Sequence, residues 1–107
     1  MKIIRNKVLP FTGFKAINLF GILFVRKGAK MSEEDINHES IHSEQMKELL
    51  YVFFYLFYVI EWLIKVVKYK DLDIAYRAIS FEREAYMNQS NLEYLLRRQP
   101  FNWITLI

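Results

Sequence analysis

Residues 36–45 of the chain read INHESIHSEQ and contain both of its histidines, His38 and His42. Just before them, Ser32 and Asp35 are spaced as in a capping box, in which each side chain bonds the other residue's backbone at a helix start. Acidic residues also occupy the positions next to the positive end of that helix. We therefore expect a helix that begins just after Ser32, with the two histidines, four residues apart, on one of its faces.

Residues 38–42 match the pattern H-E-x-x-H, which is typical of zinc hydrolases. From one helix face both imidazoles can reach a single zinc ion at about 2.0–2.1 Å. Glu39 is rotated by about 100° around the helix, so it lies beside the metal, where a general base takes a proton from zinc-activated water. The alternative interpretation is a solvated helix face with two polar histidines and a glutamate that satisfies the helix dipole.

Two histidines need a third protein ligand, with one position left for water or substrate. The candidates lie in ISFEREAY, residues 79–86, which offers Glu82 and Glu84. On a helix, Glu82 shares a stripe with small and apolar residues, whereas Glu84 shares a polar stripe that indicates the solvated side. A carboxylate in a close-packed stripe needs a partner. We therefore choose Glu82 as the ligand and keep Glu84 as a supporting or surface residue.

With these residues the chain resembles the gluzincin class of zinc metallopeptidases. The resemblance rests on HESIH, residues 38–42, followed by a helical Glu82 with Ala85 three residues later. The short chain is similar to the minimal members of the class, the minigluzincins. A similar Glu-x-x-Ala arrangement occurs in membrane-embedded bacterial heat-shock proteases of the same class.

This resemblance implies that the zinc ligands are His38, His42 and Glu82. It also implies that Glu39 polarises the attacking water, and that the substrate is a peptide or protein. The strand around residues 19–25 would be the sheet edge that receives an extended peptide by strand addition.

The chain departs from the gluzincin pattern at Tyr86, where such families often carry Asp or Asn to hold a ligand histidine. The orientation of the histidines must then come from Tyr86 itself, Glu84 or Asn88. The candidates for an oxyanion donor are Tyr69, Tyr76 and Tyr86. These departures affect the expected efficiency of catalysis more than the expected metal binding.

The composition limits the chain to a single domain, residues 1–107, with a thin core. Hydrophobic residues make up 53% and aromatic residues 17%, which is rich for a small soluble monomer and suggests surface that something else covers. The absence of cysteine excludes disulfides, thiolate zinc sites and cysteine nucleophiles. Residues 1–31 hold only basic charges, but the acidic stretch 32–48 argues against a nucleic-acid partner.

Outside the central helix, a turn is expected at Pro10 and Gly13, followed by one long strand or a hairpin bent at Gly21. No Pro or Gly occurs between residues 29 and 100, so nothing in the sequence ends the helix that carries the histidines. A further helix is expected over residues 72–96, after the capping residues Asp71 and Asp73.

The run LLYVFFYLFYVI, residues 49–60, is uncharged and apolar on every side, which predicts burial all round. It is too short to cross a bilayer, and the extension to residue 67 includes Glu61 and Lys65, which are spaced to pair. We expect part of residues 49–67 to contact a membrane or a second copy of the chain. Aromatic residues in this run are interpreted as packing, and Gln45 as a surface polar residue.

Together these patterns predict an α+β fold that is mostly helical. A long helix carries HExxH, a second helix carries the glutamate ligand, and a short N-terminal hairpin or small sheet completes it. The predicted function is a zinc metallopeptidase, either cytoplasmic or membrane-associated. It would be latent if the apolar tail Pro100–Ile107 or a second subunit covers the site. The alternative is a non-catalytic zinc-binding, membrane or self-association module with a vestigial HExxH.

Overall fold

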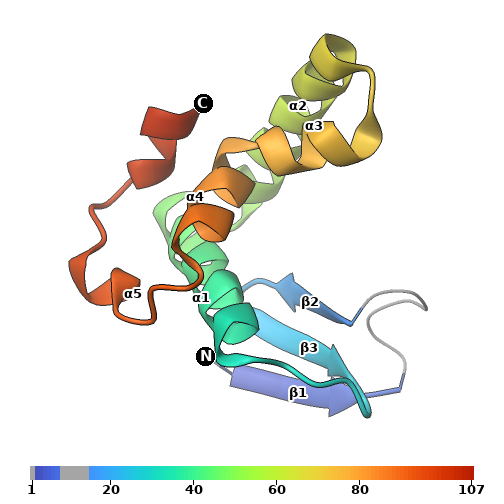
Figure 1. The fold of residues 1–107 in the computed structure, drawn as a ribbon, viewed down its shortest axis with the longest axis vertical. Helices are drawn as coiled ribbons and strands as arrows, with labels where there is room; N and C mark the ends of the chain where they lie inside the picture. Colours follow the sequence, from blue (N-terminus) through green and yellow to red (C-terminus); the bar gives the residue numbers. More distant parts are fainter. Residues whose placement is uncertain (1, 8–14) are drawn as a thin grey trace.

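The computed structural model describes residues 2–7 and 15–107, and it confirms a mostly helical α+β fold with a small sheet at its N-terminal end (Figure 1). Its elements in chain order are β1 (Lys2–Asn6), β2 (Ala16–Leu19), β3 (Ile22–Arg26), α1 (Glu33–Glu48), α2 (Val52–Tyr69), α3 (Leu72–Ala78), α4 (Ser80–Asn88), α5 (Tyr94–Arg97) and the 3₁₀ helix η1 (Asn102–Leu106). Helices α1 and α4 pack against each other, and β2 lies against α1.

The sheet has the order β1-β3-β2, with β1 parallel and β2 antiparallel to β3. Of the two sequence interpretations, the hairpin is correct, and Gly21 adopts a φ of 86° at its turn. Strand β3 lies in the centre, so the prediction of an open edge along residues 19–25 is wrong for residues 22–25. The open edge beside α1 belongs to β2. The turn expected at Pro10 and Gly13 lies outside the described residues.

Helix α1 begins as predicted, because Ser32 and Asp35 form the reciprocal capping box. It does not continue through the apolar run, because it ends in a Schellman motif. The N–H of Tyr51 donates to Met46 C=O (2.7 Å) and the N–H of Leu50 to Lys47 C=O (3.3 Å). Leu50 occupies the left-handed position at φ 53°, where glycine is usual. Because Leu50 stands where glycine is usual, the sequence gives no signal that the helix ends here.

The prediction of a single helix over residues 72–96 is wrong in two places. The helix is broken at Ile79, which is extended and fully buried, and α4 ends at Asn88, before α5 begins at Tyr94. Helix α4 then starts at Ser80, whose N–H and hydroxyl both donate to the Glu61 carboxylate of α2 at 2.7 Å. Glu61 therefore serves as a cap from another helix, where the sequence suggested a pairing with Lys65. This break turns the face of α4 that carries Glu82 toward α1.

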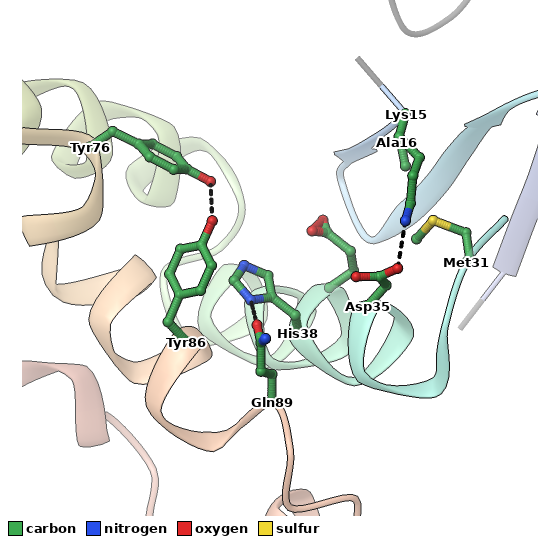
Figure 2. A pocket seen from close by; sticks show the side chains of 9 residues that line it. Lys15, Ala16, Met31, Asp35, His38, Tyr76, Tyr86 and Gln89 are labelled. Atoms are coloured by element: carbon green, nitrogen blue, oxygen red, sulfur yellow. Dashed lines mark hydrogen bonds and ion pairs between the residues drawn. The ribbon is translucent and has the colours of Figure 1, made fainter. Parts of the chain in front are cut away.

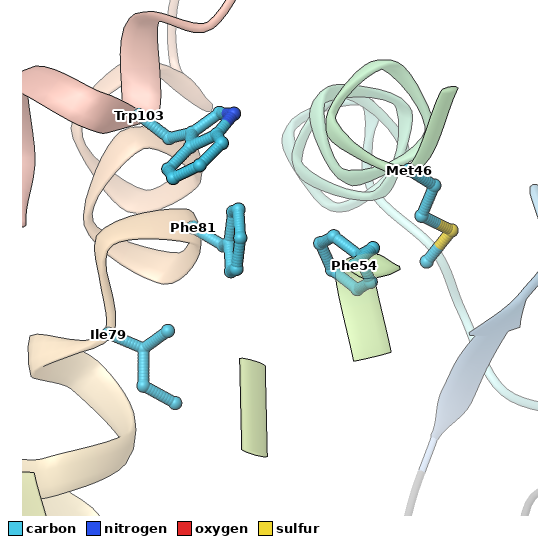
Figure 3. Packing of buried hydrophobic residues seen from close by; sticks show 5 residues of the cluster. All are labelled: Met46, Phe54, Ile79, Phe81 and Trp103. Carbon is cyan, nitrogen blue, oxygen red and sulfur yellow. The ribbon is translucent and has the colours of Figure 1, made fainter. Parts of the chain in front are cut away.

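The core is a cluster of apolar side chains between α1, α2, α4 and η1, made by Met46, Phe54, Ile79, Phe81 and Trp103 (Figure 3). The ring of Phe81 packs between Phe54 and Trp103 in tilted contacts, with ring centroids 4.8 and 4.7 Å away. The C-terminal tail is thus docked on α4 through Trp103. Its structural role is to close the core.

Helix α2 buries only Phe54 completely, and its opposite face is exposed. Among the described residues, no individual helix combines the length and apolar character that crossing a membrane requires. Helices α1 and α2 meet those criteria only when taken together, and they are bent by 109°. The prediction that residues 49–67 are not fully covered by the rest of the fold is consistent with this exposure.

Candidate metal centre

Three acceptor atoms from two helices converge between α1 and α4. The Nε2 atoms of His38 and His42 lie 3.1 Å apart, and Oε1 of Glu82 lies 3.1 Å from the first and 3.0 Å from the second. The three side chains are almost completely buried. Helical spacing places the two histidines on one face of α1, and the break at Ile79 aims Glu82 at them from α4.

The orientation of the His42 ring follows from the hydrogen bonds of Gln45. The Nε2 of Gln45 donates to Phe81 C=O (3.0 Å) and to Glu84 Oε1 (2.9 Å), both of which can only accept. The Oε1 of Gln45 therefore faces His42 Nδ1 at 2.7 Å, and this nitrogen must carry the proton. The lone pair of neutral His42 is then on Nε2, directed toward Glu82.

The Nδ1 of His38 lies 2.8 Å from Oε1 of Gln89, and this oxygen is the acceptor for a proton on that nitrogen. Lone pairs from two imidazoles and one carboxylate therefore point at a common centre. Such a buried arrangement repels itself unless a cation lies among the acceptors, either a proton or a metal ion. A buried His38–Glu39–His42 group that can bind a metal ion is also present, with ligand atoms within 4.8 Å of one another.

The size of the triangle fits zinc. Ligands at about 2.0–2.1 Å in a tetrahedron are separated by about 3.3 Å, which is close to the separations of 3.0–3.1 Å between these atoms. An ion held by these three residues would keep a fourth position for water or substrate. The donor set of two imidazoles and one carboxylate is a combination found in catalytic zinc sites.

Charge in the metal-free centre is held by His42 and Glu82. Burial alone would lower the pKa of His42, but the Glu82 carboxylate outweighs it and raises this pKa to about 9. Burial acts to raise the pKa of Glu82, but the His42 charge and three hydrogen bonds hold it well below its usual range. One of these bonds comes from the Tyr58 hydroxyl of α2, 2.6 Å from Oε2.

Behind Gln45 lies a buried ion cluster that joins α1, α4 and the segment after α5. Glu84 is fully buried and accepts from Tyr94 Oη and from Arg98 Nε, both at 2.6 Å. Arg98 also bonds both oxygens of Glu48 at 2.9 Å. Glu84 is therefore a supporting residue that contacts the centre through Gln45, and the expectation that its side of α4 is solvated is wrong.

The centre opens on a cleft with two pockets, which share Ala16, Glu39 and Tyr76. The polar pocket, about 240 Å³, is lined by residues that include Lys15, Asp35, His38, Tyr86 and Gln89 (Figure 2). The apolar pocket, about 290 Å³, is lined by His42 and Glu82 together with Leu19, Met46, Phe54 and Tyr58. Both pockets therefore border the centre and the same strand.

Glu39 is half-buried and lines both pockets of this cleft, with a carboxylate oxygen within 4.8 Å of ring nitrogens of His38 and His42. Burial raises the pKa of its carboxyl, although His42 and His38 act in the opposite direction. A carboxylate whose proton affinity is raised in this way is a better proton acceptor for a neighbouring water molecule.

The edge of β2 presents backbone groups to the cleft. The N–H of Arg26 donates to Lys15 C=O (2.9 Å), and Ala16 is paired with Val25. Hydrogen-bonded and non-hydrogen-bonded pairs alternate in an antiparallel ladder. The backbone groups of Ala16 therefore point away from β3, along the open edge where the two pockets meet. The outward carbonyl of Asn18 already accepts from the hydroxyl of Tyr55 at 3.3 Å.

Of the tyrosines considered for an oxyanion donor, two line the polar pocket and one does not. The hydroxyls of Tyr76 and Tyr86 lie 3.3 Å apart, and the Tyr86 ring packs edge-on against His38 at 4.5 Å. Tyr69 is exposed at the end of α2 and lines neither pocket. The tail Pro100–Ile107 also does not line either of these two pockets.

Three residues of the centre were missed from the sequence. Gln45 was expected on the surface and is fully buried, Tyr58 was interpreted as packing, and Gln89 was given no role. Gln45 lies three residues after His42, a spacing that puts both on one helix face and was the available signal. Asn88, considered as a support for the histidines, bonds the backbone of Glu84.

Comparison of the chain with protein-family models, with curated proteins and with solved structures finds no match.

Proposed function

We propose that the chain is a zinc metallopeptidase of the gluzincin type, with zinc held by His38, His42 and Glu82. The observation that supports this most is the convergence of three acceptor atoms, 3.0–3.1 Å apart, with the His42 proton held on the distant nitrogen. A zinc ion at that point would supply Lewis acidity, which acidifies a water molecule and polarises a substrate carbonyl.

Other side chains of the protein would orient the metal-binding groups, transfer the proton and donate a hydrogen bond to the substrate. Gln45 and Gln89 fix the imidazoles, and the hydroxyl of Tyr58 fixes the carboxylate of Glu82. The carboxylate of Glu39 accepts the proton of the attacking water and passes it to the leaving amine. Tyr76, which lines both pockets, is placed to donate to the carbonyl oxygen as its negative charge develops.

The cleft suits an extended peptide. The backbone of the peptide would pair with Ala16 on the open edge of β2, as an added strand. The apolar pocket beside His42 would receive a large apolar side chain, because Leu19, Met46 and Phe54 line it. We therefore expect cleavage next to a bulky apolar residue.

The test combines metal analysis with peptide cleavage. Purified protein loaded with Zn²⁺ is expected to bind one ion and to cleave a mixed peptide library. Glu39→Gln should keep the ion and lose cleavage by at least about a hundredfold. Glu44→Gln, on the exposed side of the same helix, is the matched control and should keep both.

Two outcomes would reject parts of this proposal. Absence of zinc binding would remove the metal centre. Stoichiometric zinc without cleavage in the wild-type protein would favour the alternative of a zinc-binding protein that is not a peptidase.

A further inference from the structure

Helix α2 carries an exposed face that is entirely apolar. Every exposed residue between positions 52 and 67 is Val, Leu, Ile or Phe. At about 100° per residue these positions fall within one continuous arc of about 160°. Near the middle of this arc lie Leu56, which is 49% exposed, and Leu63, which is 52% exposed. We call this surface the apolar face of α2.

The charged residues within this part of the helix lie outside the face. Glu61 is half-buried on the opposite side and caps α4 through Ser80. Lys65 is also half-buried on that side. An ordinary surface helix exposes its polar side to water, whereas this part of α2 exposes its apolar side.

The area of the face is large for a protein of this size. The nine exposed residues between positions 52 and 67 present on the order of 800 Å² of apolar surface, above the roughly 300–600 Å² of the largest patch on a typical monomer. Patches of this kind are covered in the working protein by a membrane or by another protein.

The composition of the face favours lipid over a second copy. Homodimer interfaces are about 65% apolar and contain about one hydrogen bond per 100–200 Å². The apolar face of α2 offers no polar side chain for such bonds. The hydrocarbon of a bilayer requires none.

The charge next to the face points to an anionic lipid surface. Lys68 and Lys70 are exposed at the C-terminal end of α2, directly beyond the apolar residues. The acids that follow are already engaged, since Asp71 caps α3 and Asp73 pairs with Arg77. Lys68 lies over the ring of Tyr69, 5.2 Å from its centroid, and stays exposed. An apolar helix face flanked by exposed cations is the pattern of helices that lie in the plane of a bilayer interface.

We propose that the apolar face of α2 docks the protein on an anionic lipid bilayer, with the helix parallel to the membrane surface. Lys68 and Lys70 contact the headgroups, and the side chains around Leu56 and Leu63 enter the acyl region. This inference does not depend on zinc binding or on peptidase activity.

The test uses flotation of the purified full-length chain with vesicles of phosphatidylcholine, alone or mixed with phosphatidylglycerol. Binding should be stronger on the mixed vesicles and should weaken as salt is added. Leu56→Glu and Leu63→Glu should each reduce partitioning by at least about tenfold, because each removes a buried leucine from lipid. Lys68→Glu should reduce binding to the mixed vesicles by about fivefold or more.

Leu96→Glu is the matched control, because Leu96 lies on α5 and is 85% exposed. It should bind like the wild-type chain. Circular dichroism must show that all variants are folded. The proposal is overturned if the wild-type chain does not float with either kind of vesicle. A dimer in sedimentation equilibrium that Leu63→Glu dissociates would then assign the face to a second copy.

Discussion

The side-chain oxygen of Gln45 accepts a hydrogen bond from the Nδ1–H of His42 at 2.7 Å. Gln45 lies one helical turn after His42 on α1. A side-chain amide does here what a carboxylate does in many histidine metal sites. The amide adds no negative charge next to the centre, and its nitrogen is used to bond Glu84. The same residue thus sets the orientation of the His42 ring and connects it to a buried ion cluster.

Replacing this amide should weaken metal binding. In Gln45→Met the imidazole of His42 loses the acceptor that fixes its proton on Nδ1, so zinc affinity should fall by about 10–100-fold. Competition with a chromophoric chelator measures the change. Gln99→Met, at an exposed position, is the control and should leave the affinity as it is. An unchanged affinity in Gln45→Met would mean that ring packing alone orients His42.

Removing the cation of the ion cluster should destabilise the fold. Arg98→Met leaves the carboxylates of Glu84 and Glu48 buried without their partner, which should cost about 3–5 kcal/mol. Urea unfolding followed by circular dichroism gives the value. Arg97→Met removes an exposed neighbouring arginine and should change stability by less than about 0.5 kcal/mol. Similar losses in both variants would contradict the role given to the cluster.

Stability of the metal-free protein should depend on pH through His42 and Glu82. The pKa of His42 is raised from 6.5 to about 9, so its contribution is complete below pH 6.5 and is lost as pH rises through 9. The pKa of Glu82 is lowered from 4.5, so its contribution is lost as pH falls below 4.5.

Thermal unfolding with a chelator present should therefore show the highest midpoint between pH 4.5 and 6.5 and a decline toward pH 9. Zinc requires neutral imidazoles, so its stabilising effect should grow over the same rise in pH. His42→Gln should flatten the decline of the metal-free protein above pH 6.5. A decline that persists in this variant would assign it to other groups.

Loss of the tail should destabilise the protein instead of activating it. Trp103 packs on Phe81 in the core, so Trp103→Ala should cost about 3–5 kcal/mol. Truncation after Gln99 should lower the thermal midpoint in the same direction. A truncated protein with an unchanged midpoint and increased peptidase activity would restore the idea that the tail covers the site.

Local patterns were sufficient to predict that His38 and His42 share one face of a helix and that Glu82 lies on another helix, but not where that second helix begins and ends. The capping box at Ser32 depends on four consecutive residues, and the common face of His38 and His42 depends only on helical geometry. Glu82 was preferred over Glu84 because of the small residues on its stripe, and it is the acid that lies against both imidazoles. These inferences needed no knowledge of how the helices pack.

The features that were missed depend on packing between distant segments. Leu50 ends α1 in a left-handed conformation although leucine gives no signal for it, because the apolar run must fold back on the core. Tyr58 was interpreted as one aromatic residue among many, and its hydroxyl acquires a role only because α4 lies opposite. Glu84 is buried because Arg98 reaches it from beyond α5, which sequence periodicity cannot indicate.

Helix α2 has two different sides: Tyr58 on one side bonds Glu82 of the candidate metal centre, and Leu56 on the other side is exposed. The distance between these sides is the diameter of one helix, about 10 Å. With the outer side resting on a bilayer as proposed, the cleft would be suspended just above the headgroups. A peptidase held at this height would cleave polypeptide segments that lie close to the lipid surface. It would not reach loops that extend far from the bilayer into water.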